Sequence, residues 1–198
     1  QPDRLIRRLY LDLTGLIPPA EVVKSFNANP SDEHYRQIVE QLLKDEQHGV
    51  RWAKFWLDLV RYADSDGYSA GSYRDEAWRY RDYVIDSFNQ NRPYDQFIRQ
   101  QLAGDELEPK NQKAQIATGF LRHWIYEFNQ RDAKSQWDII LNDITDVTGD
   151  AFLGLGMSCA RCHDHKFDPI LQNDYYRLRA FFAPLLPLDE QLAGTPTE

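Results

Sequence analysis

The sequence predicts an all-α fold, a single domain of roughly eight or nine helices. Two observations lead to this prediction: apolar residues recur at helical spacing along most of the 198 residues, and alternating strand patterns are nearly absent. The hydrophobic fraction of 42% and the charged fraction of 27% are ordinary for a globular chain, and the length is sufficient for one sizeable core.

Three helices are predicted before residue 44. In residues 4–15 the apolar side chains share one face, and Gly15 ends the pattern. The second helix starts at a pair of prolines, where a missing backbone N–H is tolerated. Ser31 is the predicted N-cap of the third helix, because its hydroxyl can accept a hydrogen bond from a backbone N–H of the first turn.

The rest of the chain continues the helical pattern. The predicted segments are 50–64, 76–88, 94–104, 112–124, 135–153 and 173–185. Residues from 184 onward are rich in Pro, Gly and Thr, which favours a linker or tail. The prediction is therefore one helical domain over residues 1–183, followed by a tail over 184–198.

Charge and hydropathy exclude two classes of partner. The net charge is −8 and the pI is about 5.1, which argues against a nucleic-acid partner. No apolar run approaches the roughly 18 to 20 residues needed to cross a bilayer, so no membrane span is predicted in this segment. The polar opening "QPDRLIRRLY" lacks the pattern of a signal peptide, and we expect an excised or processed piece of a longer precursor.

The stretch "MSCARCHDHKFDPI", residues 157–170, gathers the rare reactive side chains of the chain. It contains both cysteines, the single methionine and two of the five histidines. Cys159, Cys162 and His163 form C-x-x-C-H, the pattern by which haem is covalently attached in c-type cytochromes. We therefore predict that the two thiols carry haem c through thioether bonds, that His163 binds the iron, and that the helices pack around the attached haem.

Two other interpretations of the cysteine pair are weaker. A structural zinc site needs a fourth ligand, and no second C-x-x-C or H-x-x-x-H pair supplies one beside Cys159, Cys162 and a histidine. A thioredoxin-like dithiol needs a βαβ unit, and no strands are predicted.

The second axial ligand of the iron is predicted by elimination. The candidates are Met157 and the other four histidines, His34, His48, His123 and His165. Met157 and His165 lie two residues from the motif, on the side fixed by His163, while His34 and His48 are in polar or terminal settings.

His123 ends an apolar helical stretch and is the predicted metal ligand, giving bis-histidine coordination. A satisfied core histidine is the alternative, and a Tyr, a water or an open position also remains possible at the iron. We further expect His165, Asp164 or Asp168 to orient the imidazole of His163.

Several stretches resemble a known family. These are "LDLTGLIPP", "RWAKFWLDLVRYADSDGY", "WRYRDYVIDSFNQNRPYDQFIRQQLAGDEL", "IATGFLR", "CARCHDHKFDPI" and "DYYRLRAFF". Together they resemble the cytochrome-like domain of unknown function found in large planctomycete proteins, over residues 4–183. The resemblance implies an extracytoplasmic, periplasmic or extracellular, protein with covalent haem c and often with further domains. It supports Cys159, Cys162 and His163, and it implies no settled reaction.

Three functions remain open at this stage. The first is an electron-transfer domain whose partner is a redox protein or a neighbouring domain of the same precursor. The second is a haem enzyme, peroxidase-like or binding a small molecule, with an open sixth position. The third is a structural or docking domain of a larger protein. The sequence favours electron transfer over an enzyme, because C-x-x-C-H is the one chemical motif in an otherwise ordinary helical domain.

Overall fold

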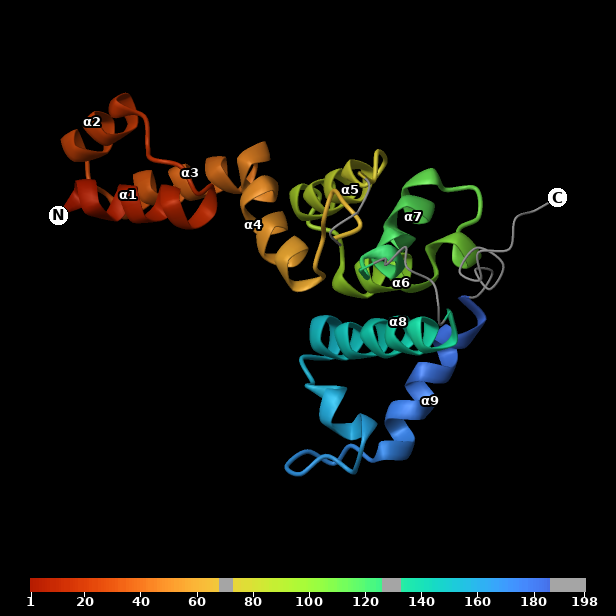
Figure 1. Ribbon diagram of the computed structural model, residues 1–198. Helices are drawn as coiled ribbons and strands as arrows, with labels where there is room; N and C mark the ends of the chain where they lie inside the picture. The colour runs from red at the N-terminus through yellow and green to blue at the C-terminus, as the bar shows by residue number, and fades with distance from the viewer. Residues whose placement is uncertain (68–72, 126–132, 186–198) are drawn as a thin grey trace. The chain divides into compact units, whose positions relative to one another are not determined.

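The chain folds into helices joined by connections of unequal length (Figure 1), as seen in a computed structural model that describes residues 1–67, 73–125 and 133–185. Within these ranges there are nine α-helices and no strand beyond an isolated bridge between Ser65 and Tyr73. The helices are α1 Pro2–Leu13, α2 Ala20–Ala28, α3 Asp32–Leu43, α4 Glu46–Leu59, α5 Trp78–Asn89, α6 Tyr94–Leu107, α7 Gln112–Ala117, α8 Ala133–Thr148 and α9 Gln172–Phe182. The prediction of an all-α fold is confirmed.

Two helices change their winding where an α-helix was predicted to continue. The α-helix α7 ends at Ala117 and becomes a 3₁₀-helix over Thr118–Arg122. Similarly, α8 ends at Thr148 and continues as a π-helix over Gly149–Leu153. Helical periodicity predicted both segments as helix, but it does not separate these windings from the α form.

The contacts divide the chain into two compact units. Unit 1 contains Gln1–Asp58 and Trp78–Gly119, and unit 2 contains Leu59–Ala77 and Phe120–Glu198. The chain enters unit 2 after α4, returns to unit 1 for α5 to α7, and then stays in unit 2. The predicted boundary at residues 183 and 184 lies at the edge of the described residues, so the domain limits stay a prediction.

The first part of unit 1 is a small apolar core made by α1, α2 and α3. Its buried residues are Ile6, Leu9, Phe26, Ile38 and Leu42. At the start of α3 the backbone N–H of His34 donates to Oγ of Ser31 at 3.2 Å. The predicted N-cap at Ser31 is therefore confirmed.

The second part of unit 1 is built around a fully buried glutamine. Oε1 of Gln101, on α6, accepts hydrogen bonds from Nε1 of Trp56, on α4, and from the hydroxyl of Tyr80, on α5. The ring of Trp56 packs edge-on against Phe97 with centroids 4.8 Å apart. One side chain thus satisfies buried donors from two other helices.

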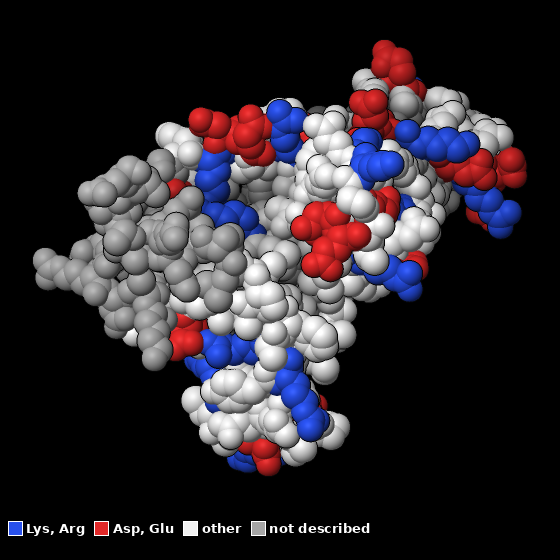
Figure 2. Space-filling view, turned by 90° about the vertical axis from the view of Figure 1, so that its right-hand side faces the viewer, with Lys and Arg blue, Asp and Glu red and all other residues white. Residues whose placement is uncertain are grey.

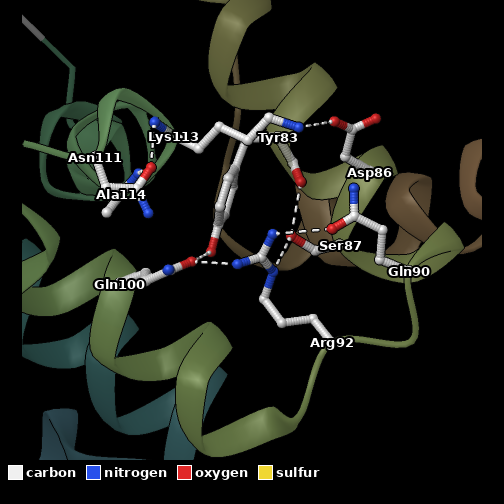
Figure 3. Close-up of polar contacts among 9 residues, drawn as sticks. All are labelled: Tyr83, Asp86, Ser87, Gln90, Arg92, Gln100, Asn111, Lys113 and Ala114. Carbon is white, nitrogen blue, oxygen red and sulfur yellow. Dashed lines mark hydrogen bonds and ion pairs between the residues drawn. The ribbon is translucent and has the colours of Figure 1, made fainter. Parts of the chain in front are cut away.

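An arginine after α5 ties that helix to α6 (Figure 3). Arg92 donates from Nε to Oγ of Ser87 at 3.1 Å and from Nη1 to Oε1 of Gln100 at 2.6 Å. The hydroxyl of Tyr83 donates to the same oxygen of Gln100 at 3.0 Å. The guanidinium group lies over the ring of Tyr83, 5.3 Å from its centroid.

Unit 2 is built on α8, which has a buried apolar face and a row of carboxylates. Ile140, Leu141, Ile144 and Val147 are buried. Figure 1 shows α8 and α9 converging where α8 begins and α9 ends, and the segment between them returning to the start of α9. Three ion pairs join α8 to other segments of unit 2: Asp138 with Arg179, Asp143 with Arg61, and Asp146 with Arg161.

Charged groups of both signs are mixed on the molecular surface. On the face shown in Figure 2, acidic and basic side chains lie beside one another, and the basic ones do not form a continuous stripe. Among the described helices none is long and apolar enough to cross a membrane, in agreement with the prediction for this segment.

Gly104 offers a test of how closely α6 and α7 approach. A Cβ atom at this position would lie 2.2 Å from the carbonyl oxygen of Ala114, which is backbone and cannot move aside. We expect Gly104→Ala to lower the free energy of unfolding by about 1–3 kcal/mol in urea denaturation, the usual cost of overpacking. The matched control is Gly156→Ala, where no atom lies within 4 Å of the added Cβ and the free energy should stay within about 0.5 kcal/mol.

Candidate functional site

The C-x-x-C-H motif lies on an exposed turn of unit 2. Residues Met157–Arg161 form a 3₁₀-helix, and the backbone N–H of Cys162 donates to the carbonyl oxygen of Cys159 at 3.4 Å. Both cysteines are free thiols and both are exposed. Since the pair forms no disulfide, the two thiols remain available for chemistry with a ligand.

This turn is anchored through two buried side chains that lie three residues apart, one turn of the 3₁₀-helix. Met157 and Ala160 are buried against Ile170 and Tyr175, and Ala160 is fully buried. Because Met157 and Ala160 point into unit 2, the other side of the turn points to solvent. The thiols of Cys159 and Cys162 lie on that exposed side. Local burial therefore decides which side chains of the motif are available to a ligand.

His163 is exposed, and its tautomer is set by its neighbour. Its Nδ1 lies 2.7 Å from the carbonyl oxygen of Asp164. Because a carbonyl oxygen can only accept, Nδ1 must carry the proton, and Nε2 of the neutral ring keeps its lone pair. This is the form in which a histidine binds a metal through Nε2.

The expectation that His165, Asp164 or Asp168 orients His163 is corrected in its details. Asp164 holds His163, but through its carbonyl oxygen, while its carboxylate accepts the backbone N–H of Gln172 at 2.8 Å. Nδ1 of His165 accepts the backbone N–H of Asp168 at 2.9 Å. The carboxylate of Asp168 is 3.2 Å from the same nitrogen, which has no proton left to give it. His165 thus stabilises its own loop.

His123 lies in the interior of unit 2, with 8% of its surface exposed. Its ring packs edge-on against Tyr62 and Phe120, at centroid distances of 5.7 Å and 6.5 Å. Burial lowers the pKa of His123 to about 3, and the positive charge of Arg74 contributes to this shift. A hydrogen bond with the backbone of Val60 raises the pKa but is outweighed. The imidazole is therefore neutral at physiological pH.

A packed path runs from His123 to the motif turn. Phe120, next to the His123 ring, packs edge-on against Phe152 at 4.9 Å. Phe152 belongs to the π-helix, whose first residue, Gly149, contacts Met157 so closely that a Cβ atom would lie 2.8 Å from its Cγ. Met157 is thereby held inside unit 2.

The structure thus groups the predicted site residues in two places. Cys159, Cys162 and His163 share one exposed turn, and His123 lies in the interior of the same unit. His34 and His48 both belong to unit 1, where each ring is 3.1 Å from a backbone carbonyl oxygen. In the part of the chain that the structure describes, no group of three or more His, Cys, Asp or Glu side chains is placed to hold a metal ion.

These residues fit a haem bound through thioethers better than a metal ion held by the protein alone. A haem brings four nitrogen ligands of its own, so the protein needs to supply only the two thiols and an axial imidazole. Two free, exposed thiols and an imidazole with Nε2 as acceptor are present on one turn.

Comparison with known proteins identifies one family. The family model PSCyt2, described as a protein of unknown function (DUF1549), matches residues 1–186. Searches of curated proteins and of solved structures returned no match.

The buried, neutral His123 should make the fold sensitive to acid. Because its pKa is lower in the folded protein than the usual 6.5, its contribution is fully present above pH 6.5 and is lost as the pH falls toward 3. We expect it to add a slope of up to about 1.4 kcal/mol per pH unit to the free energy of unfolding in that window. Urea denaturation at several pH values measures this slope.

The control for that experiment is His34→Gln, which should keep the slope, whereas His123→Gln should remove it. Equal slopes in wild type and His123→Gln would contradict the assignment of His123 as a buried neutral group.

Proposed function

The chain belongs to the PSCyt2 family, and from this premise we propose that it is a c-type cytochrome domain that binds haem c covalently and transfers electrons outside the cytoplasm. Cys159 and Cys162 hold the haem, and His163 is an axial ligand of its iron. The partner is a redox protein or a neighbouring domain of the same precursor.

One observation carries the proposal: Nδ1 of His163 donates to the carbonyl oxygen of Asp164, on a turn that presents two free thiols. The hydrogen bond fixes the ring orientation and leaves Nε2 as the ligating atom. The thiols bracket the turn just before this ring, so that attachment at both would hold the imidazole beside the iron. The sequence and the local geometry support the same chemistry.

The haem would supply an iron that changes between the ferric and ferrous states, and the protein would supply its binding and its surroundings. His163 binds on one side, and we propose His123 as the second ligand. Its neutral state supports this role, because a metal binds the unprotonated imidazole. Met157 is not proposed as a ligand because it lies two residues from the motif, on the side that His163 fixes.

Covalent attachment is tested by producing the protein in a bacterium with a c-type maturation system. We expect a haem that stays with the polypeptide after acidified-acetone extraction and shows the α-band of haem c in pyridine. Cys159→Ser or Cys162→Ser should leave a single thioether and shift that band, because one vinyl group is retained, and the double variant should lose covalent haem. Haem that is fully extractable from the wild type would contradict the proposal.

The second ligand is tested separately by visible spectroscopy. We expect wild type to be low-spin and unreactive toward carbon monoxide when reduced, and His123→Ala to keep its haem but become high-spin and bind carbon monoxide. His48→Ala, a histidine of unit 1, is the control and should match wild type. Carbon monoxide binding by wild type would favour an open sixth position, as in a haem enzyme, and an unchanged low-spin His123→Ala would assign the ligand to another residue.

A further inference from the structure

A group of polar side chains, Arg161, Asp146 and Tyr175, joins the C-x-x-C turn to the helices next to it. In the proposed function these side chains bind neither the iron nor the haem. Arg161, the second of the two residues between the cysteines, extends to α8, where Nη1 lies 4.0 Å from Oδ2 of Asp146. Tyr175 of α9, fully buried, packs under the turn, and its hydroxyl lies 3.4 Å from the carbonyl oxygen and from Oδ1 of Asn142 on α8. The turn is therefore connected to both helices of unit 2 that flank it.

Arg161 is held through its backbone as well. Its carbonyl oxygen accepts hydrogen bonds from Nε2 of Gln172 and from the hydroxyl of Tyr176, each at 3.1 Å, and both donors belong to α9. The side chain of Arg161 thus binds α8 while its carbonyl group binds α9. Because Arg161 lies directly between the two cysteines, these contacts fix the piece of backbone that spaces the thiols.

Asp146 is a costly residue to place here. Its Oδ1 is buried and has no hydrogen-bond donor among the described residues, and only 21% of its side chain is exposed. Burial raises its pKa, and so do the carboxylates of Asp150 and Asp143 on the same helix, while Tyr175 and Arg161 lower it. A carboxylate that is disfavoured by its own surroundings, yet directed at the motif turn, indicates a role other than stability.

We propose that Asp146 is a positioning residue that acts through Arg161 to hold the C-x-x-C turn in the geometry required for attachment at both cysteines. The inference rests on the proposed function for its purpose, but the coupling between Asp146 and the turn exists in the chain without haem. Asp146 contacts neither a thiol nor His163 in this arrangement; it fixes the backbone that carries them.

The ionised form of Asp146 is the one that holds Arg161. Since its pKa is raised, protonation begins at a higher pH than for an ordinary aspartate, and the turn should loosen on acidification before the rest of unit 2. The charged or titratable groups around Asp146 are Asp143 on α8, Asp150 in the π-helix that follows it, Arg161 on the turn and Tyr175 on α9. The pair with Arg161 weakens when Asp146 takes up its proton.

The experiment compares Asp146→Asn with wild type in the haem-free chain, using amide hydrogen exchange and thermal unfolding. Asparagine keeps the shape and removes the charge. We expect exchange of the amides of residues 159–163 to become about two- to fivefold faster, the loss expected for one partly exposed ion pair. The melting temperature at pH 7 should change little, because the side chain of Arg161 is 43% exposed and stays solvated without its partner. A merely structural residue would instead lower the melting temperature.

The matched control is Asp143→Asn, on the same helix, whose partner is Arg61 rather than the motif turn. It should leave exchange of residues 159–163 unchanged. Arg161→Ala should loosen the turn as Asp146→Asn does, with no further effect in the double variant, and Asp146→Glu should restore part of the protection. After correction for intrinsic exchange, acidification should loosen the turn in wild type but not in Asp146→Asn.

The haem-bound protein provides the second measurement. With a c-type maturation system, Asp146→Asn should give a larger fraction of singly attached haem by mass spectrometry than wild type or Asp143→Asn. The proposal is overturned if Asp146→Asn leaves exchange of the turn unchanged or alters it no more than Asp143→Asn, or if the attachment pattern equals that of wild type. If wild type takes no haem while Asp146→Asn still loosens the turn, the proposed function fails and the coupling stands.

Discussion

The ion pairs of α8 are the constraint on which the arrangement of unit 2 depends. Each joins the helix to a different part of the chain: Asp143 to Arg61, Asp146 to Arg161 and Asp138 to Arg179. Every one of these side chains is partly exposed, so a single pair contributes at most about 1 kcal/mol. Their importance is therefore that they determine the position along α8 at which each partner segment binds. They fix where the segment after α4, the motif turn and α9 meet α8, while the buried apolar face supplies most of the stability.

The helices could be predicted because their signals are local. Apolar periodicity and the Ser31 cap need only residues within one or two turns, and both were confirmed. The departures after Ala117 and Thr148 depend on distant contacts instead. The π-helix is stabilised where Phe152 meets Phe120 and where Met157 lies against Gly149, and the sequence does not show which of these residues are neighbours. Likewise, the division into two interleaved units follows from long-range contacts that periodicity does not report.

In the candidate site, too, the residues with a local sequence signal were predicted and those that depend on distant contacts were missed. Three residues within five positions define the attachment motif, whose two cysteines are exposed and free; attachment of haem there stays a prediction. The partner of His163 was missed in its details because it is a backbone carbonyl group, which any residue after the histidine could provide. Asp146 and Tyr175 were missed because no sequence signal connects a helical aspartate or a core tyrosine to the motif turn. Asp146 lies 15 residues before Arg161, and Tyr175 lies 13 residues after Cys162.

Two opposed requirements explain why the site is built from an exposed turn on a closely packed base. The proposed covalent attachment of haem would require thiols and an imidazole that a large planar ligand can reach, which favours exposure and weak local packing. Correct spacing of the thiols requires a backbone that does not move, which favours burial. The three-residue period of the 3₁₀-helix satisfies both, because Met157 and Ala160 are buried while Cys159 and Cys162 are exposed. Arg161, whose side chain reaches α8 and whose carbonyl group binds α9, then fixes the remaining freedom of the turn. This arrangement places the carboxylate of Asp146 in a mostly buried position, which costs free energy. The positive charge of Arg161 offsets part of that cost, and neither the thiols nor His163 contribute to it.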